Sequence, residues 1–237
     1  MKTRRDDQQV NFHLGLDENG LGPRLGPMIV TAVMARTNDA GSKLVQQKAQ
    51  GELAARLGDS KGLVSHGKID LAEAWTRVLV RRGVGLHRRD GTPEDLVAAL
   101  SLDPPKTLRS PCPAGLEKQC WALQPQAFED NEATRSSLEL LSTDLDHMAR
   151  AGVEIVSVRS VILCAKRLNE AAAKGTNRFV ADLHAMERLI LALRKEAGQD
   201  VDAVCGKVGG FSKYGRAFGP MGDRLHTVMQ EERGRSA

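Results

Sequence analysis

Two adjacent acids, Asp17 and Glu18, are the residues of this 237-residue chain best suited to chemistry. A short apolar segment precedes them, and a turn with three glycines and two prolines follows within the next nine residues. Such a turn is neither helix nor regular strand, so it exposes main-chain N–H groups beside the carboxylates. Carboxylates bind hard divalent cations, and clustered N–H groups bind phosphate oxygens. The pattern predicts metal-dependent phosphodiester chemistry; the alternative is a hairpin loop with two solvated acids.

The glycine spacing argues against the common nucleotide-binding loops. Gly20-x-Gly22-x-x-x-Gly26 misses the dinucleotide-binding pattern by one position, and its prolines would block the helix that must follow. The sequence also has no P-loop motif. A Rossmann-type or ATPase function is therefore disfavoured.

The segment resembles the opening motif of type 2 ribonuclease H (ribonuclease HII), D-E-[AV]-G-R-G-P-x-x-G-P. The matching positions, with their spacing, are Asp17, Glu18, Gly20, Gly22, Pro23, Gly26 and Pro27. A second block, Asp59-Ser60-Lys61, is similar to the D-S-K block that the family carries about forty residues downstream. Together the two matches cover roughly residues 12–82, and the order of the later segments is similar in layout.

The resemblance implies an α/β fold, a ribonuclease H-like mixed β-sheet flanked by helices. It implies a metal-dependent endonuclease that cleaves RNA in RNA/DNA hybrids, or single ribonucleotides in duplex DNA, with Mg²⁺ or Mn²⁺ as cofactor. Asp17 and Glu18 would be the metal ligands. The backbone of Gly20, Leu21 and Gly22 would approach the 2′-hydroxyl, which distinguishes RNA from DNA, and Ser60 and Lys61 would hold a phosphate.

Three departures from the family pattern concern the site. Leu21 stands where the family has arginine, so one side-chain contact to the substrate is lost. Cys205 stands where the family has its third acid, and a thiol is a poor ligand for hard cations. The block that carries the fourth acid is not found between Gly210 and Ala237. If the resemblance holds, Asp17 and Cys205 lie on adjacent strands with converging side chains.

Alternating strands and helices must position these residues. We expect strands at 11–16, 28–35, 153–158 and 201–205, of which the second is β-branched as a central strand would be. Helical spacing predicts helices at 43–57, 67–82, 132–150, 165–173 and 179–198. In the last of these, Leu183, Met186, Leu189, Ile190 and Leu193 share one face.

Residues 85–131 differ in character from the rest of the chain. Six prolines crowd this stretch, which predicts an inserted, loop-rich subdomain with one short helix near Pro93–Leu100. We otherwise expect residues 1–237 to form a single ribonuclease H-like domain.

Composition sets broad limits on location and partners. Aromatic residues make up only 3% of the chain, so the core must be aliphatic. A net charge of +4 is compatible with a polyanionic partner such as nucleic acid. Four scattered cysteines, with neither an export signal nor a long apolar run, predict a cytoplasmic protein with no membrane partner. The oligomeric state is left open.

Three functions remain from the sequence alone. The first is a ribonuclease HII-like endonuclease. The second is a catalytically impaired protein on the same scaffold that binds RNA/DNA hybrid, which the substitution at Cys205 favours. The third is an interaction protein that recruits a partner through residues 85–131.

Overall fold

The computed structural model describes residues 10–19, 26–58, 60–63, 68–111, 127–208, 214–215, 217–222, 231–232 and 235–236. The strands of this part are β1 (Asn11–Asn19), β2 (Met28–Thr37), β3 (Val153–Leu163), β4 (Asp202–Cys205), β5 (Glu231–Glu232) and β6 (Arg235–Ser236). The helices are α1 (Asp39–Leu44), the 3₁₀-helix η1 (Gly51–Ala55), α2 (Ser60–Leu63), α3 (Asp70–Arg81), α4 (Pro93–Leu100), α5 (Pro105–Arg109), α6 (Glu132–Arg150), α7 (Ala165–Ala173) and α8 (Arg178–Ala197).

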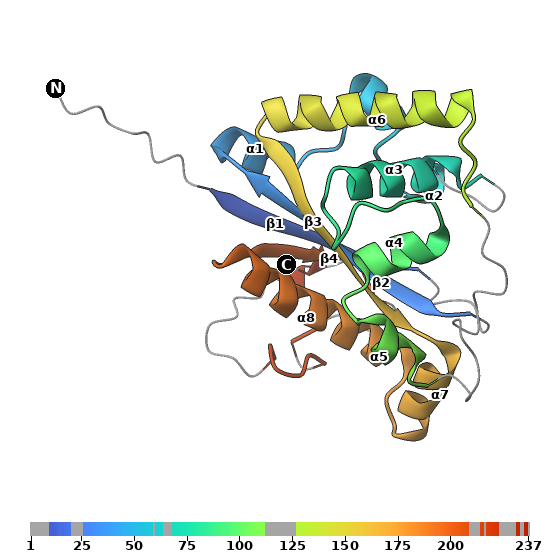
Figure 1. Cartoon of the computed structure of the whole chain (residues 1–237). Coiled ribbons are helices and arrows are strands. Elements are labelled where there is room, and N and C mark those ends of the chain that lie inside the picture. Colours follow the sequence, from blue (N-terminus) through green and yellow to red (C-terminus); the bar gives the residue numbers. More distant parts are fainter. Residues whose placement is uncertain are drawn as a thin grey trace.

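The strands form one mixed sheet in the order β3-β2-β1-β4-β6-β5. β2 pairs antiparallel with β1 and with β3, while β1 and β4 run parallel. The two-residue strands β5 and β6 extend the sheet beyond β4. The α/β class, with a mixed sheet flanked by helices, is therefore confirmed (Figure 1).

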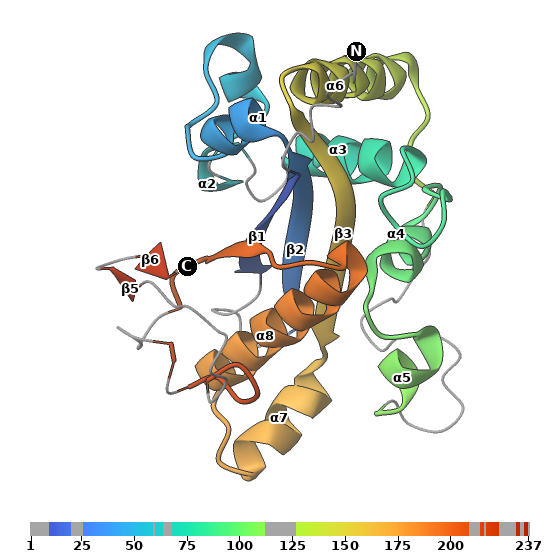
Figure 2. The ribbon, with the colours of Figure 1, turned by 90° about the vertical axis from the view of Figure 1, so that its left-hand side faces the viewer.

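Helices cover both faces of the sheet (Figure 2). One face, here called the α8 face, presents alternate residues of the central strands to α8, including Leu14, Leu16, Val30 and Ala32. α8 packs on these residues through a stripe of buried side chains that includes Met186, Leu189 and Leu193. Since side chains alternate along a strand, the intervening residues point to the opposite face, where α6 packs on β3 and α3 packs on α6.

β1 is longer than the sequence predicts. The expected strand ends at Leu16, but pairing with β2 continues through Asp17↔Thr31, Glu18↔Val30 and Asn19↔Ile29. The two acids therefore lie inside the last residues of a central strand, not in the loop that follows it. The β-branched partners on β2 favour extended backbone opposite the acids, which accounts for the extra pairs.

The helix predictions succeed where periodicity is long. α6 has the predicted bounds, and Asn131 caps it by accepting a hydrogen bond from the Thr134 N–H. The helix predicted at 43–57 is wrong, because α1 ends at Leu44 and only the short η1 follows. Gly51 has a φ of +60°, a left-handed conformation that an α-helix cannot contain.

The described part of residues 85–131 contains α4 and α5 and one isolated bridge to the sheet, Ser101↔Ser160. The predicted helix at Pro93–Leu100 is confirmed as α4, capped by the Thr92 hydroxyl. Asp103, which is buried, accepts hydrogen bonds from Arg167 of α7 and Arg188 of α8. These ion pairs tie the segment to the helices beside the sheet.

Candidate functional site

Asp17 and Glu18 lie at the carboxyl end of β1, beside the parallel strand β4. Alternation along β1 places Glu18 on the α8 face with Leu16, while Asp17 points to the opposite face. Asp17 is exposed and Glu18 is half-buried. The Asp17 carboxylate accepts a hydrogen bond of 3.0 Å from the Glu18 N–H, so its orientation is fixed locally.

Cys205 ends β4 directly beside Leu16, and the next residue continues the pairing through a 2.8 Å hydrogen bond from the Gly206 N–H to the Leu16 carbonyl. The expectation that Asp17 and Cys205 occupy adjacent strands is thus confirmed. The expected convergence of their side chains is wrong. The Cys205 side chain lies in the core with Leu16, on the face opposite Asp17.

Gly206 is the β4-side neighbour of the Asp17 carboxylate. A Cβ atom added at Gly206 would lie 2.5 Å from Asp17 Oδ1, closer than two such atoms can approach. The glycine after Cys205 therefore leaves the room that the Asp17 side chain occupies.

The Cys205 thiol is unsuited to metal binding in this setting. Burial, and then the charge of Asp182, raise its pKa to about 12, so the thiol stays protonated at neutral pH. A protonated thiol does not replace a carboxylate as a ligand for Mg²⁺ or Mn²⁺. The position at which the resemblance predicts a third acid therefore contributes no charge here.

Asp182 of α8 is the residue of this region that the sequence predictions missed. Its side chain is fully buried, and neither of its carboxylate oxygens has a hydrogen-bond partner among the described residues. Burial, and then the charges of Glu18 and Asp17, raise the pKa of Asp182 to about 7. A third carboxyl group, on the helix that packs on β1, is therefore influenced by the charges of the two β1 acids.

A signal for Asp182 was present in the sequence. Residues 182, 186, 189 and 193 follow helical spacing, so Asp182 continues the apolar stripe formed by Met186, Leu189 and Leu193. A carboxyl group in a core position is rare unless it is paired or has a function.

The segment after β4 is anchored to the sheet and to α8. The buried Tyr214 hydroxyl accepts a hydrogen bond from the Val208 N–H and donates one to the Gly206 carbonyl. Glu187 of α8 accepts hydrogen bonds from the N–H groups of Gly219 and Met221. The Tyr214 hydroxyl therefore holds the backbone of Gly206 beside Asp17, whereas Glu187 holds the segment further along the chain.

The other predicted site residues are less fully described. Gly20, Leu21 and Gly22 lie outside the described residues. Ser60 and Lys61 begin the four-residue helix α2. Their roles toward the 2′-hydroxyl and a phosphate stay predictions.

The fit of the site to a divalent metal is partial. Asp17, Glu18 and Asp182 supply the oxygen ligands that Mg²⁺ and Mn²⁺ prefer, and the unpartnered oxygens of Asp182 leave donors available. However, within the described part of the chain, no group of three or more His, Cys, Asp or Glu side chains is arranged to hold a metal ion. The chemistry of the donors fits, whereas a closed three-ligand shell is not formed.

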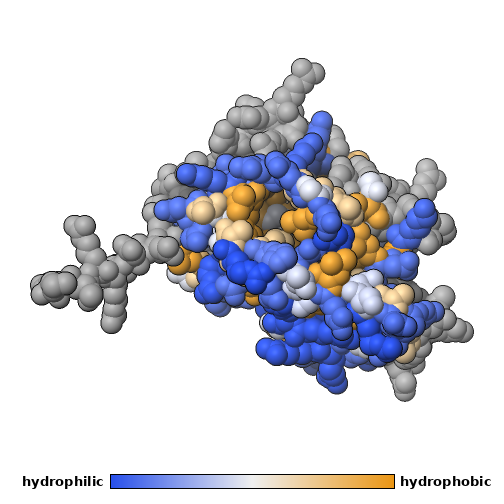
Figure 3. All heavy atoms as spheres, turned by 90° about the horizontal axis from the view of Figure 1, so that it is seen from above, coloured by the Kyte–Doolittle hydropathy of each residue, from blue (hydrophilic) through white to orange (hydrophobic). Residues whose placement is uncertain are grey.

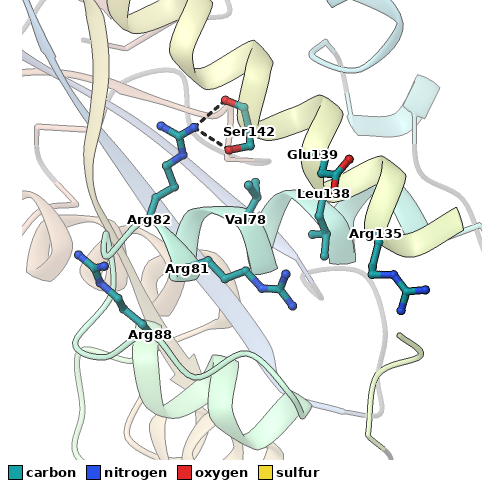
Figure 4. A pocket seen from close by; sticks show the side chains of 8 residues that line it. All are labelled: Val78, Arg81, Arg82, Arg88, Arg135, Leu138, Glu139 and Ser142. Carbon is teal, nitrogen blue, oxygen red and sulfur yellow. Dashed lines mark hydrogen bonds between the residues drawn. The ribbon is translucent and has the colours of Figure 1, made fainter. Parts of the chain in front are cut away.

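Away from these acids, a concave region lies between α3, α6 and the segment after α3 (Figure 4). It is a cavity of about 570 Å³, lined by Val78, Arg81, Arg82, Arg88, Arg135, Leu138, Glu139 and Ser142. Arg81 pairs with Asp90, and Arg82 pairs with Asp146 and with Ser142. Acids already neutralise part of its charge, and its helices cover the face of the sheet opposite Glu18.

The α6 side of the molecule also exposes apolar surface. Figure 3 shows hydrophobic residues around a hollow on this side, surrounded by hydrophilic ones. A small depression between α3 and α6 is lined in part by Leu71, Leu140 and Leu141. Leu140 is 45% exposed, and nothing in the structure indicates what covers it.

Comparisons of the chain with protein-family models, with curated proteins and with solved structures find no match. Among the described residues, no helix combines the length and the apolar character that crossing a membrane requires.

Proposed function

We propose that the chain is a ribonuclease HII-like, metal-dependent endonuclease that acts on RNA in RNA/DNA hybrids or on ribonucleotides in duplex DNA. The observation that carries this proposal is the position of Asp17 and Glu18 at the end of a central strand, on which helix α8 with the buried carboxyl group of Asp182 packs. The carboxyl ends of strands are where α/β folds place their chemistry.

In this proposal, Asp17 and Glu18 hold the cation, and the glycine turn that follows them approaches the 2′-hydroxyl of the substrate. Bound Mg²⁺ or Mn²⁺ would activate a water molecule and stabilise the leaving oxygen. Gly206 keeps space for the Asp17 side chain, and the Tyr214 hydrogen bonds hold the backbone of that glycine.

A second candidate is a protein on the same scaffold that binds RNA/DNA hybrid without turnover. It is favoured by the buried, protonated thiol of Cys205, which provides no charge at the position of the third family acid. Two divalent ions held close together repel each other and need several carboxylates to offset that repulsion. We therefore expect weak metal binding and slow cleavage at most.

The two candidates are separated by measuring cleavage and binding with Mn²⁺ on three duplexes: all-DNA, DNA with a single embedded ribonucleotide, and an RNA/DNA hybrid. Mn²⁺-dependent cleavage of the duplexes that contain ribonucleotides, but not of all-DNA duplex, supports the nuclease. Binding of RNA/DNA hybrid without cleavage supports the impaired binding protein. Failure of folded protein to bind hybrid at low salt contradicts both and favours an interaction protein.

A further inference from the structure

The geometry points to Asp182 as the residue that supplies the missing third negative charge of the metal site, from helix α8 in place of strand β4. This inference rests on the proposed function and deepens it. Asp182 is a positioning residue: its charge favours a divalent cation held by Asp17 and Glu18, and its unpartnered oxygens can accept hydrogen bonds from water bound to that cation.

The first step of the argument is that Asp182 has no structural partner. Its side chain is 0% exposed, and neither carboxylate oxygen accepts a hydrogen bond within the described part of the chain. A buried carboxyl group without partners is destabilising, because it loses its hydration and gains no hydrogen bond in return. Stability alone does not explain an aspartate at this position.

The second step is a comparison within α8. Glu187, five residues further along, is also buried, but its two oxygens accept hydrogen bonds from the N–H groups of Gly219 and Met221. Arg188 likewise pairs with Asp103. Unlike Glu187, Asp182 is thus a buried acid of α8 whose carboxylate oxygens remain available to bind a ligand or a water molecule.

The third step is position. Helix α8 packs on β1, and alternation along β1 places Glu18 on the face that α8 covers. The charges of Glu18 and Asp17 act on Asp182, and the charge of Asp182 acts on Cys205. An unpartnered carboxyl group on the same side of the sheet as Glu18 favours a cation near the end of β1.

The fourth step explains why the charge comes from the helix. Cys205 fills the core position beside Leu16 on the α8 face, so β4 supplies no acid there. Asp182 approaches the same face from below, as the continuation of the stripe that contains Met186 and Leu189. The described side chains do not form a closed three-ligand group, which fits a role for Asp182 in orienting the ligands and holding a metal-bound water.

The test compares Mn²⁺ binding by wild type and by Asp182→Asn, measured by titration calorimetry and by the loss of the free Mn²⁺ signal in electron paramagnetic resonance. Because mutation of residues that orient metal ligands typically lowers affinity by about 10- to 100-fold, we expect a loss of that size. Urea unfolding without metal is the second readout, and Asp182→Asn should be at least as stable as wild type.

Glu187→Gln is the matched control, because it neutralises a buried carboxylate of the same helix that is already hydrogen-bonded. It should lower stability and leave Mn²⁺ affinity unchanged. Equal Mn²⁺ affinity in wild type and Asp182→Asn would overturn this inference and leave the proposed function standing. No Mn²⁺ binding by folded wild type would overturn both.

Discussion

Glu18 of β1 and the buried Asp182 of α8 lie on the same side of the sheet, and after burial the charge of Glu18 contributes most to the raised pKa of Asp182. Burial, and then the charges of Glu18 and Asp17, raise the pKa of Asp182 from 3.8 to about 7. A cation bound near Asp182 would oppose this shift, because a nearby positive charge favours the ionised form of a carboxyl group.

The first prediction is a pH dependence of stability that comes from Asp182. Its pKa is higher in the folded than in the unfolded chain, so its favourable contribution is complete below about pH 4 and is lost as the pH rises through about 7. The loss is on the order of 4 kcal/mol. Urea unfolding of wild type and Asp182→Asn across this range measures it, and the curves should separate only above about pH 4.

The groups that face Asp182 also bear on this prediction. Glu18 and Asp17 act from β1, Cys205 from β4, and Tyr214 from the segment after β4. The pKa values of Cys205 and Tyr214 are raised, so both stay neutral through the range of the experiment. Parallel pH profiles of wild type and Asp182→Asn would show that Asp182 is not buried against the β1 acids.

The second prediction concerns Gly206. In Gly206→Ala, the added Cβ would lie 2.5 Å from Asp17 Oδ1, so the carboxylate must rotate away. The fold should persist, because the displaced atom is the end of an exposed side chain. Mn²⁺ affinity should fall. Gly15→Ala on β1 is the control, since its new Cβ meets nothing within 4 Å; an equal effect of both changes would point to a general loss of strand geometry.

The third prediction concerns the anchor of the segment after β4. Tyr214→Phe removes the hydroxyl that bonds to the Val208 N–H and to the Gly206 carbonyl. A buried N–H left without its partner costs roughly 1–3 kcal/mol, so the free energy of unfolding should fall by that amount. Chemical denaturation checks this result, and an unchanged midpoint would mean that the segment does not depend on this hydroxyl.

The sequence predicted the parts of the fold that are specified locally. β2 and α6 follow from β-branched composition and from long helical periodicity, and the Asp17-Glu18 pair follows from its own motif. The helix prediction at 43–57 failed because Gly51 adopts a left-handed conformation, which the spacing of apolar residues does not reveal. Asp182 was missed because its candidate role depends on packing against β1, which lies more than 160 residues earlier in the chain. Likewise, only the register of β4 shows that Gly206, and not Cys205, adjoins Asp17.

The fourth prediction concerns nucleic-acid binding. Contacts to about two phosphates, expected from Lys61 and the glycine turn, predict that affinity for RNA/DNA hybrid falls about tenfold between roughly 50 and 200 mM salt. Fluorescence anisotropy with labelled hybrid measures this change, with all-DNA duplex as the comparison. Affinity that does not vary with salt would contradict a phosphate-contacting surface.

The most direct measurement is Mn²⁺-dependent cleavage of a duplex with one embedded ribonucleotide, compared between wild type and Asp17→Asn. Asp17 is exposed, so its replacement should leave stability nearly unchanged. Because even residues that only orient metal ligands cost about 10- to 100-fold when mutated, loss of a ligand should lower cleavage by more than about 100-fold. We predict slow cleavage by wild type, confined to the ribonucleotide, and none detectable with Asp17→Asn. Cleavage that survives Asp17→Asn would contradict the placement of the metal site at the end of β1.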